Sequence, residues 1–316
     1  MVLAASALLL APAAIAQSGV RRVGVLGMIS VSSGKEILDA FRDAMRGLGH
    51  VEGKNLVIEY RQLASETDQR PAREMVARKV DLIVAWATPP SMTARDATST
   101  IPIVIVGVAD PVTTGLVKSL ARPGGNLTGV TNFSVELVTK QLQILQDLIP
   151  GLQLVGIVVN LGNPAVRLQL QQTERSMREL GLRWQVVEGR TPAEFDNAFE
   201  RLKASGIGAA VMLPDPSLVE HRAMIARAAI KARVATMFQR RENAEAGGLI
   251  SYGPDITDQF RQVAGYVDRI FQGAKPGDLP VQQPTKLSLV VDARTAKAIG
   301  ITIPQSVLLR ADKVIE

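Results

Sequence analysis

The stretch that decides the fold runs from Val23 to Phe41 and reads VGVLGMISVSSGKEILDAF. An apolar strand pattern, a loop and an amphipathic helix pattern follow one another, as at the start of a nucleotide-binding α/β fold. The loop 27–34 reads GMISVSSG and lacks the G-x-G-x-x-G spacing that lets a backbone approach a pyrophosphate, which argues against NAD. Ser30, Ser32 and Ser33 instead predict a site for a small carboxylate or another polar group beside a helix N-terminus.

A structural explanation of the same loop stays open. Ser33 and Glu36 have the S-x-x-E spacing of a capping box, so Ser33 could serve only as a helix N-cap. Ser30 and Ser32 would then be solvated turn residues. In either case the pattern predicts a helix after the loop, with Ile37 and Phe41 on its buried face.

Short apolar runs alternate with helix patterns along most of the chain. Uniformly apolar strands between helices are typical of a parallel sheet that is covered on both faces. The first series of strand candidates is 23–26, 56–60, 82–86, 103–106 and 128–130, and the second is 154–159, 183–187, 209–213, 235–238 and 249–251. The sequence therefore predicts an α/β protein with two doubly wound parallel-sheet lobes.

The two series carry matching segments. VGV at 23–25 matches VGI at 155–157, and MRGLG at 45–49 matches MRELG at 177–181, with 132 residues between the members of each pair. This repetition favours two similar lobes, although unrelated α/β halves can converge on such patterns. Turn-forming segments predict a hinge of several strands between the lobes. The expected boundaries are 20–128 plus about 253–283 for lobe 1, and 129–252 plus possibly 284–316 for lobe 2.

The N-terminus predicts export. An apolar run is followed by Ala14-Ile15-Ala16, the small-x-small pattern that precedes signal-peptidase cleavage, so residues 1–16 are expected to be a signal peptide. No Lys or Arg precedes the run, which departs from the usual leader. No other segment has 18 consecutive apolar residues, and we expect a periplasmic protein.

The composition excludes several kinds of function. The 316 residues are 47% hydrophobic and 21% charged, include no Cys and only two His, and carry a net charge of +6. Thiol chemistry is therefore excluded, and a multi-histidine metal site cannot form. No run of five Lys or Arg suggests nucleic-acid binding, and no catalytic motif is present. We expect no enzyme activity, no cofactor and no metal.

The candidate ligand-binding residues follow strand candidates. In an open parallel sheet, ligands bind beyond the carboxyl ends of the strands, and two facing lobes would share one ligand. Trp86 could stack on an apolar ligand group or pack under its own loop, and Thr88 could cap a helix or contact the ligand. The remaining candidates in such loops are Asp110, Asn132, Asn160, Asn163, Asp215, Arg241 and Tyr252.

These polar candidates suggest particular interactions. Asp110 and Asp215 each precede a proline and could bind a ligand ammonium or act as N-caps. One Arg of the pair 240–241, for which we choose Arg241, could hold a carboxylate with its planar fork. The three Asn residues could contact a ligand or only form turns, and Tyr252 lies at the proposed hinge.

Several longer segments resemble a known family. They are RRVGVLGM (21–28), GLGHVEGKNLVIEYR (47–61), VADPVTTGLVKSLARPGGNLTGV (108–130), EAGGLISYGPD (245–255), VDRIFQGAKPGDLPVQQPTK (267–286) and TAKAIGITIPQSVLLRADKVI (295–315). In these segments the chain resembles the ABC-transporter substrate-binding proteins of the tryptophan/tyrosine type, which have the type I periplasmic-binding-protein fold. The resemblance implies capture of a small molecule outside the cytoplasmic membrane and its delivery to a permease.

The sequence as a whole predicts an extracytoplasmic solute-binding protein of an ABC importer. We expect a monomer that closes at its hinge around a small molecule, with an aromatic amino acid or a related small carboxylate as the favoured ligand class, and that meets ABC permease subunits. A ligand-sensing module of the same fold, signalling to a receptor or regulator, is the alternative. A periplasmic enzyme is a third and weaker possibility.

Overall fold

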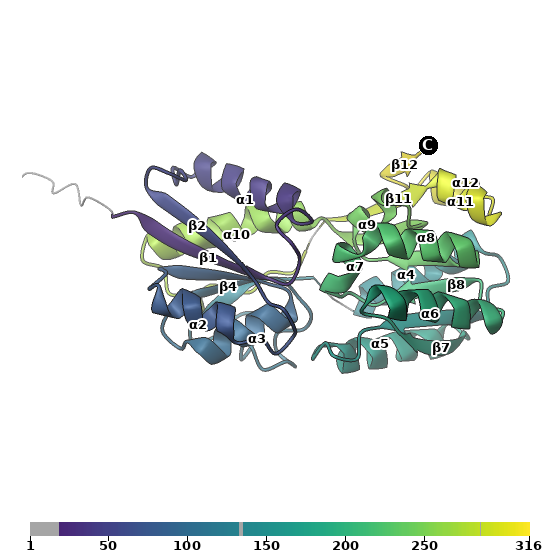
Figure 1. The fold of residues 1–316 in the computed structure, drawn as a ribbon, viewed down its shortest axis with the longest axis horizontal. Helices are drawn as coiled ribbons and strands as arrows, with labels where there is room; N and C mark the ends of the chain where they lie inside the picture. The colour runs from purple at the N-terminus through teal and green to yellow at the C-terminus, as the bar shows by residue number, and fades with distance from the viewer. Residues whose placement is uncertain (1–18, 133–134, 285) are drawn as a thin grey trace, which may run out of the picture.

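The computed structural model describes residues 19–132, 135–284 and 286–316 of the chain. The α/β prediction is confirmed, because two separate sheets are each flanked by helices (Figure 1). The predicted signal peptide lies outside the described residues. Within those residues, no helix combines the length and the apolar character that crossing a membrane requires.

The first lobe is built on a five-stranded sheet whose strands are all parallel, in the order β2-β1-β3-β4-β5. Its strands are β1 (Arg21–Gly27), β2 (Leu56–Gln62), β3 (Leu82–Trp86), β4 (Ile103–Val108) and β5 (Leu127–Thr131). One face packs under α1 (Lys35–Gly47) and α10 (Ile256–Phe271), and the other under α2 (Arg70–Ala77) and α3 (Thr88–Ala97). We call this sheet and its helices lobe 1.

The second lobe is built on a seven-stranded sheet in the order β12-β11-β10-β9-β8-β6-β7, in which β11 runs antiparallel to β10. Its strands are β6 (Leu154–Val159), β7 (Arg183–Glu188), β8 (Ala209–Met212), β9 (Ala235–Phe238), β10 (Ile250–Pro254), β11 (Leu287–Asp292) and β12 (Lys313–Ile315). Its helices are α4 (Val135–Leu148), α5 (Val166–Glu179), α6 (Pro192–Ala204), α7 (Pro216–Glu220), α8 (Arg222–Ala232), α9 (Arg241–Glu245), α11 (Ala293–Ile299) and α12 (Gln305–Leu308). We call this unit lobe 2.

The repetition seen in the sequence corresponds to repeated topology. The order β2-β1-β3-β4-β5 of lobe 1 recurs in lobe 2 as β7-β6-β8-β9-β10, so β6 occupies the place of β1. The matching segments at 23–25 and 155–157 lie in these two equivalent strands. Each lobe therefore presents the carboxyl ends of five parallel strands at one edge.

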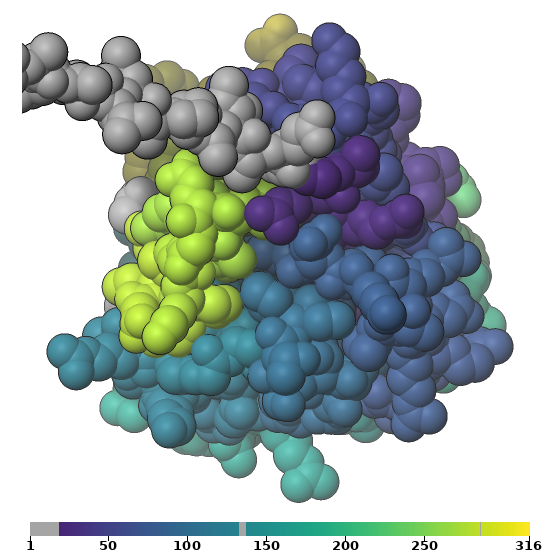
Figure 2. Space-filling model, turned by 90° about the vertical axis from the view of Figure 1, so that its left-hand side faces the viewer, coloured from purple at the N-terminus to yellow at the C-terminus, as the bar shows by residue number. Residues whose placement is uncertain are grey.

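The chain passes between the lobes three times. It leaves β5 of lobe 1 for α4 of lobe 2, returns from β10 to α10, and crosses again before β11. Helix α10 packs against α1 across more than 200 residues of sequence, and Figure 2 shows its yellow-green surface against the purple and blue start of the chain. The tail from Leu287 adds β11 and β12 to the sheet of lobe 2.

Most strand predictions were correct to within two residues, but one helix signal was wrong. The capping box at Ser33 and Glu36 does not form, because the N-cap of α1 is Gly34 and no side chain caps it. The Thr191 side chain does form a capping box with Glu194 at the start of α6. Ser33 differs because its hydroxyl lies beside Ser30 Oγ, at 2.9 Å, instead of capping the helix.

Candidate functional site

A cavity lies between the strand ends of the two lobes, with about 530 Å³ of space free of protein atoms. Five of the predicted residues line it, and they come from both lobes: Trp86, Thr88, Asn132, Asn163 and Asp215. The cavity thus lies beyond the carboxyl ends of the strands, where ligands bind in open parallel sheets; we call this expectation the strand-end rule.

The apolar wall of the cavity belongs mainly to lobe 1. Trp86, at the end of β3, is only 4% exposed and makes an edge-to-face contact with Phe260 of α10, with ring centroids 5.3 Å apart. The guanidinium carbon of Arg240, from lobe 2, lies 5.3 Å from the centroid of the Trp86 ring. Trp86 therefore both packs in the core and borders the cavity, and the cation–π contact joins the lobes.

The loop after Trp86 has an unusual backbone conformation. Ala87 lines the cavity with φ 77° and ψ 171°, a region that side chains other than glycine rarely adopt. Thr88 follows as the first residue of α3, and its hydroxyl oxygen accepts a hydrogen bond from Ala109 N at 3.3 Å. Strain of this kind costs on the order of 1–3 kcal/mol and persists where the surroundings hold the backbone in place. The loop is thus fixed beside the cavity.

Asp215 is held by the residues around it. One carboxylate oxygen accepts from Ser217 N at 2.9 Å and from the Ser217 hydroxyl, so Asp215 is the N-cap of α7. The other oxygen accepts from the amides of Asn160 at 3.1 Å and Asn163 at 2.8 Å. A carboxylate offers about four acceptor positions, so protein donors occupy those of Asp215.

The serine-rich loop that opened the sequence holds a carboxylate of the protein itself. Glu220, at the end of α7 in lobe 2, accepts from Ser30 N at 2.8 Å and from Ser30 Oγ at 3.2 Å. Ser32 and Ser33 line a separate hollow beside α1. None of the three serines lines the interlobe cavity, and the carboxylate that Ser30 contacts belongs to the opposite lobe.

Glu220 also affects a tyrosine of lobe 1. Burial raises the pKa of Tyr60, and the nearby carboxylate of Glu220 raises it further. Tyr60 therefore stays protonated beyond its ordinary range and fixes the backbone of Ile29, which lines the cavity.

A second polar contact also joins the lobes. Glu66, in the loop after β2, accepts from the amide of Asn160 at 2.9 Å and pairs with Arg190 at 3.7 Å. Asn160 therefore links Glu66 of lobe 1 to Asp215 of lobe 2 rather than lining the cavity itself.

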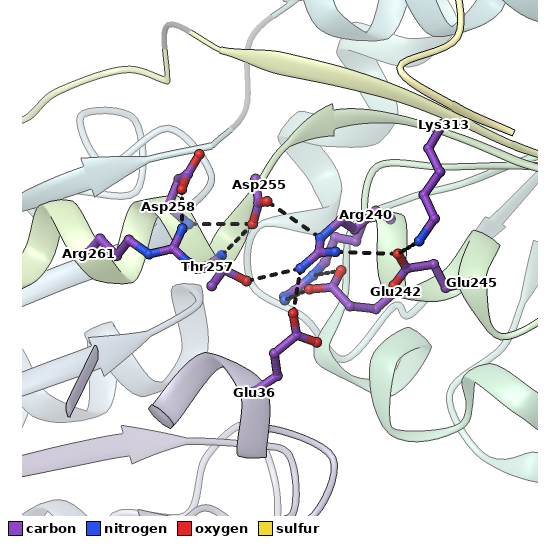
Figure 3. Close-up of polar contacts among 10 residues, drawn as sticks. Glu36, Arg240, Glu242, Glu245, Asp255, Thr257, Asp258, Arg261 and Lys313 are labelled. Carbon is purple, nitrogen blue, oxygen red and sulfur yellow. Dashed lines mark hydrogen bonds and ion pairs between the residues drawn. The ribbon is translucent and has the colours of Figure 1, made fainter. Parts of the chain in front are cut away.

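Arg241 lies in a network of ion pairs beside the hinge, and Figure 3 labels its partners Glu36, Glu245 and Asp255. It contacts Glu36 of α1 at 2.7 Å, Glu245 at 3.3 Å and Asp255 at 3.5 Å, and Lys313 pairs with the same Glu245. Burial lowers the pKa of Arg241, but these carboxylates outweigh the effect and leave the pKa raised. The guanidinium that borders the cavity is that of Arg240, which pairs with Glu242 at 3.4 Å.

Two further predicted residues lie away from the cavity. The carboxylate of Asp110 accepts from the amides of Val112 and Thr113 at 3.2 and 3.0 Å, so it shapes its own turn. Tyr252 lies in β10, packs against the core of lobe 2, and accepts from the Gln141 amide through its carbonyl oxygen.

The sequence reasoning did not select Gln239 and Arg240, which follow β9 and line the cavity. The strand-end rule points to their loop but does not say which of its side chains turns inward. It also omitted the apolar Ile29 and the buried Gln169. Within the described residues, no three His, Asp or Glu side chains gather as a metal site requires.

Two α/β lobes of matching topology that enclose a cavity at their facing strand ends define the type I periplasmic-binding-protein fold. Residues 22–315 match the family described as ABC transporter substrate binding protein, and the chain belongs to that family. The family and the relatives below are solute-binding proteins, not enzymes.

Three relatives illustrate the similarity. A tyrosine-binding protein of Clostridioides difficile is 25% identical over 285 residues, which cover 89% of this chain and 81% of the relative. A conserved domain protein from Vibrio cholerae has a TM-score of 0.87 at 28% identity, over 93% of this chain and 99% of the other. An ABC domain from Streptococcus pneumoniae in complex with L-Trp has a TM-score of 0.85 at 25% identity, with the same coverage.

Proposed function

We propose that the protein captures an aromatic amino acid or a related small carboxylate in the interlobe cavity and delivers it to the permease of an ABC importer. The observation that carries this proposal is the composition of the cavity wall, in which both lobes contribute and an apolar side meets a few charged and amide groups. Sites for small amphiphilic molecules have this composition. The relatives that bind tyrosine or L-Trp support the choice of ligand class.

The charged groups of the wall suggest how a zwitterion would be held. Of the residues that line the cavity, Arg240 carries the positive charge and Asp215 the negative one. Arg240 is the proposed partner of the ligand carboxylate, because its contacts with Glu242 are long, at 3.4 and 3.5 Å. Asp215 contributes a negative potential, since its acceptor positions are already used.

Closure at the hinge is the proposed mechanism of capture. Contacts between Glu220 and Ser30 and between Glu66 and Asn160 join the lobes and break if the lobes separate. A ligand that touches both lobes binds the closed form better than the open one, and that difference shifts the population. The periplasm is the proposed location, in line with the family description.

A thermal-shift panel on the protein without residues 1–16 tests the proposal. It would contain tyrosine, tryptophan, phenylalanine, branched amino acids and aromatic carboxylates. A ligand at 100 times its Kd stabilises the folded state by about 2.7 kcal/mol. At about 2–4 °C per kcal/mol, the melting temperature should rise by roughly 5–10 °C. If no aromatic compound raises it while another solute does, the proposed ligand class is wrong.

Arg240→Gln tests the carboxylate assignment. The wild-type protein should prefer a free amino acid over its carboxamide by about 10–150-fold, the value of one hydrogen bond to a charged group. The variant should lose most of that preference in calorimetric titrations. A preference that persists in Arg240→Gln would place the carboxylate elsewhere.

A further inference from the structure

Gln239 stands directly after β9, at the strand edge that faces the cleft. It lines the cavity and is only 4% exposed. Its amide nitrogen donates to Asn132 O at 2.7 Å. This bond fixes the orientation of the amide, because the flipped form would place two carbonyl oxygens against each other. The Oε1 atom is buried and has no hydrogen-bond partner.

Two other polar residues of the wall, Asp215 and Asn163, already have donors for their side-chain oxygens. Both oxygens of Asp215 accept protein hydrogen bonds, and Asn163 Oδ1 accepts from Ala165 N at 2.9 Å. A buried acceptor without a donor destabilises the structure that contains it, so native proteins rarely keep one unless something else fills the position. Gln239 Oε1 is therefore a buried acceptor in this wall to which a bound molecule could donate a hydrogen bond.

We propose that Gln239 Oε1 receives a hydrogen bond from the ligand and makes the site select molecules that carry an N–H or O–H group at that point. The inference rests on the proposed function, because it concerns the same cavity. Two parts of an aromatic amino acid could supply the hydrogen: its ammonium group, or a donor on its ring such as the tyrosine hydroxyl. A site built around such an acceptor rejects an analogue that lacks the donor.

Gln259 provides a matched control within the same hinge. It is also buried, at 2% exposure, and its amide donates to Thr131 O at 3.1 Å, one residue before the carbonyl that Gln239 holds. Its Oε1 is likewise unpartnered, but Gln259 does not line the cavity. Changing Gln259 perturbs the anchoring of the same crossing segment without touching the ligand.

The experiment compares Kd values for two ligand pairs in the wild type, Gln239→Met and Gln259→Met. The first pair is L-tyrosine and L-phenylalanine, which differ by the ring hydroxyl. The second is L-phenylalanine and 3-phenylpropanoate, which differ by the ammonium group. The wild type should prefer the donor-bearing member of at least one pair by about 5–150-fold, the cost of leaving one buried acceptor unpaired. That preference should fall toward unity in Gln239→Met and persist in Gln259→Met.

The outcomes separate the two proposals. If the wild type binds neither these pairs nor any other aromatic compound of the thermal-shift panel, the proposed ligand class fails and the inference fails with it. If the wild type binds but neither pair shows a preference, the inference is wrong while the proposed function stands, and that result needs no variant to fold. If the preference survives in Gln239→Met, or falls equally in both variants, Gln239 does not accept a hydrogen bond from the ligand and only stabilises the hinge. The pair whose preference collapses identifies the donor.

Discussion

Removing Glu220 should weaken ligand binding although Glu220 does not line the central cavity. Its carboxylate, from α7 of lobe 2, accepts from Ser30 N at 2.8 Å and from Ser30 Oγ at 3.2 Å in lobe 1. This contact is present only when the lobes meet. Glu220→Ala therefore destabilises the closed form relative to an open one, and binding coupled to closure loses the same free energy.

The size of the effect follows from the contact. A hydrogen bond to a charged group contributes about 1.5–3 kcal/mol, and we take the lower part of that range because Glu220 is partly exposed. A loss of about 1–2 kcal/mol corresponds to a Kd about 5–30-fold weaker. The dissociation rate should carry most of the change, because the open form still admits the ligand.

Calorimetric titration and stopped-flow kinetics with the tightest ligand of the panel would measure the effect. Asp312→Ala is the matched control, since Asp312 accepts from Leu289 N at the same distance of 2.8 Å but within lobe 2. It should leave the Kd unchanged whatever it does to the melting temperature. An unchanged Kd in Glu220→Ala, or an equal loss of affinity in both variants, would refute the proposal that the Glu220–Ser30 contact stabilises the closed form.

Three other perturbations test separate parts of the structure. Gly129→Ala should lower the free energy of unfolding in urea by about 1–3 kcal/mol or more. The reason is that φ at Gly129 is 141° and an added Cβ would lie 2.0 Å from a backbone carbonyl oxygen of β4. The control Gly265→Ala in α10 has open space around the new Cβ and should not destabilise the protein. Hydrogen bonds from the Arg70 side chain and from backbone N–H groups hold the pKa of Asp68 at about 2. The ionised Asp68 should therefore stabilise the fold above about pH 4, and this stabilisation should be lost as the pH falls toward 2. The acid-unfolding curve of Asp68→Asn should lack that loss of stability. Burial and Glu220 keep Tyr60 protonated in the folded protein, so the stability that Tyr60 contributes should fade as the pH rises above about 10. Glu220→Ala should move the ultraviolet titration of Tyr60 to lower pH. That shift should be absent when Tyr60→Phe is also present.

Local patterns in the sequence were enough to establish the architecture. The alternation of apolar strands with amphipathic helices predicted parallel sheets, and the matching segments in the two halves predicted two similar lobes. These features are set by residues close together in the chain, where side-chain periodicity decides which face is buried. The strand-end rule also located Trp86, Thr88 and Asp215 in the cavity wall.

The contacts between lobes could be decided only in the tertiary structure. The serine-rich loop is filled by Glu220, which lies 190 residues further along the chain, and no local pattern encodes that pairing. After β9, Arg240 turns toward the cavity, while Arg241, the first residue of α9, turns toward Glu36 and Asp255. Neighbouring side chains share the same sequence context, and only the docking of the second lobe determines which of them faces the ligand site.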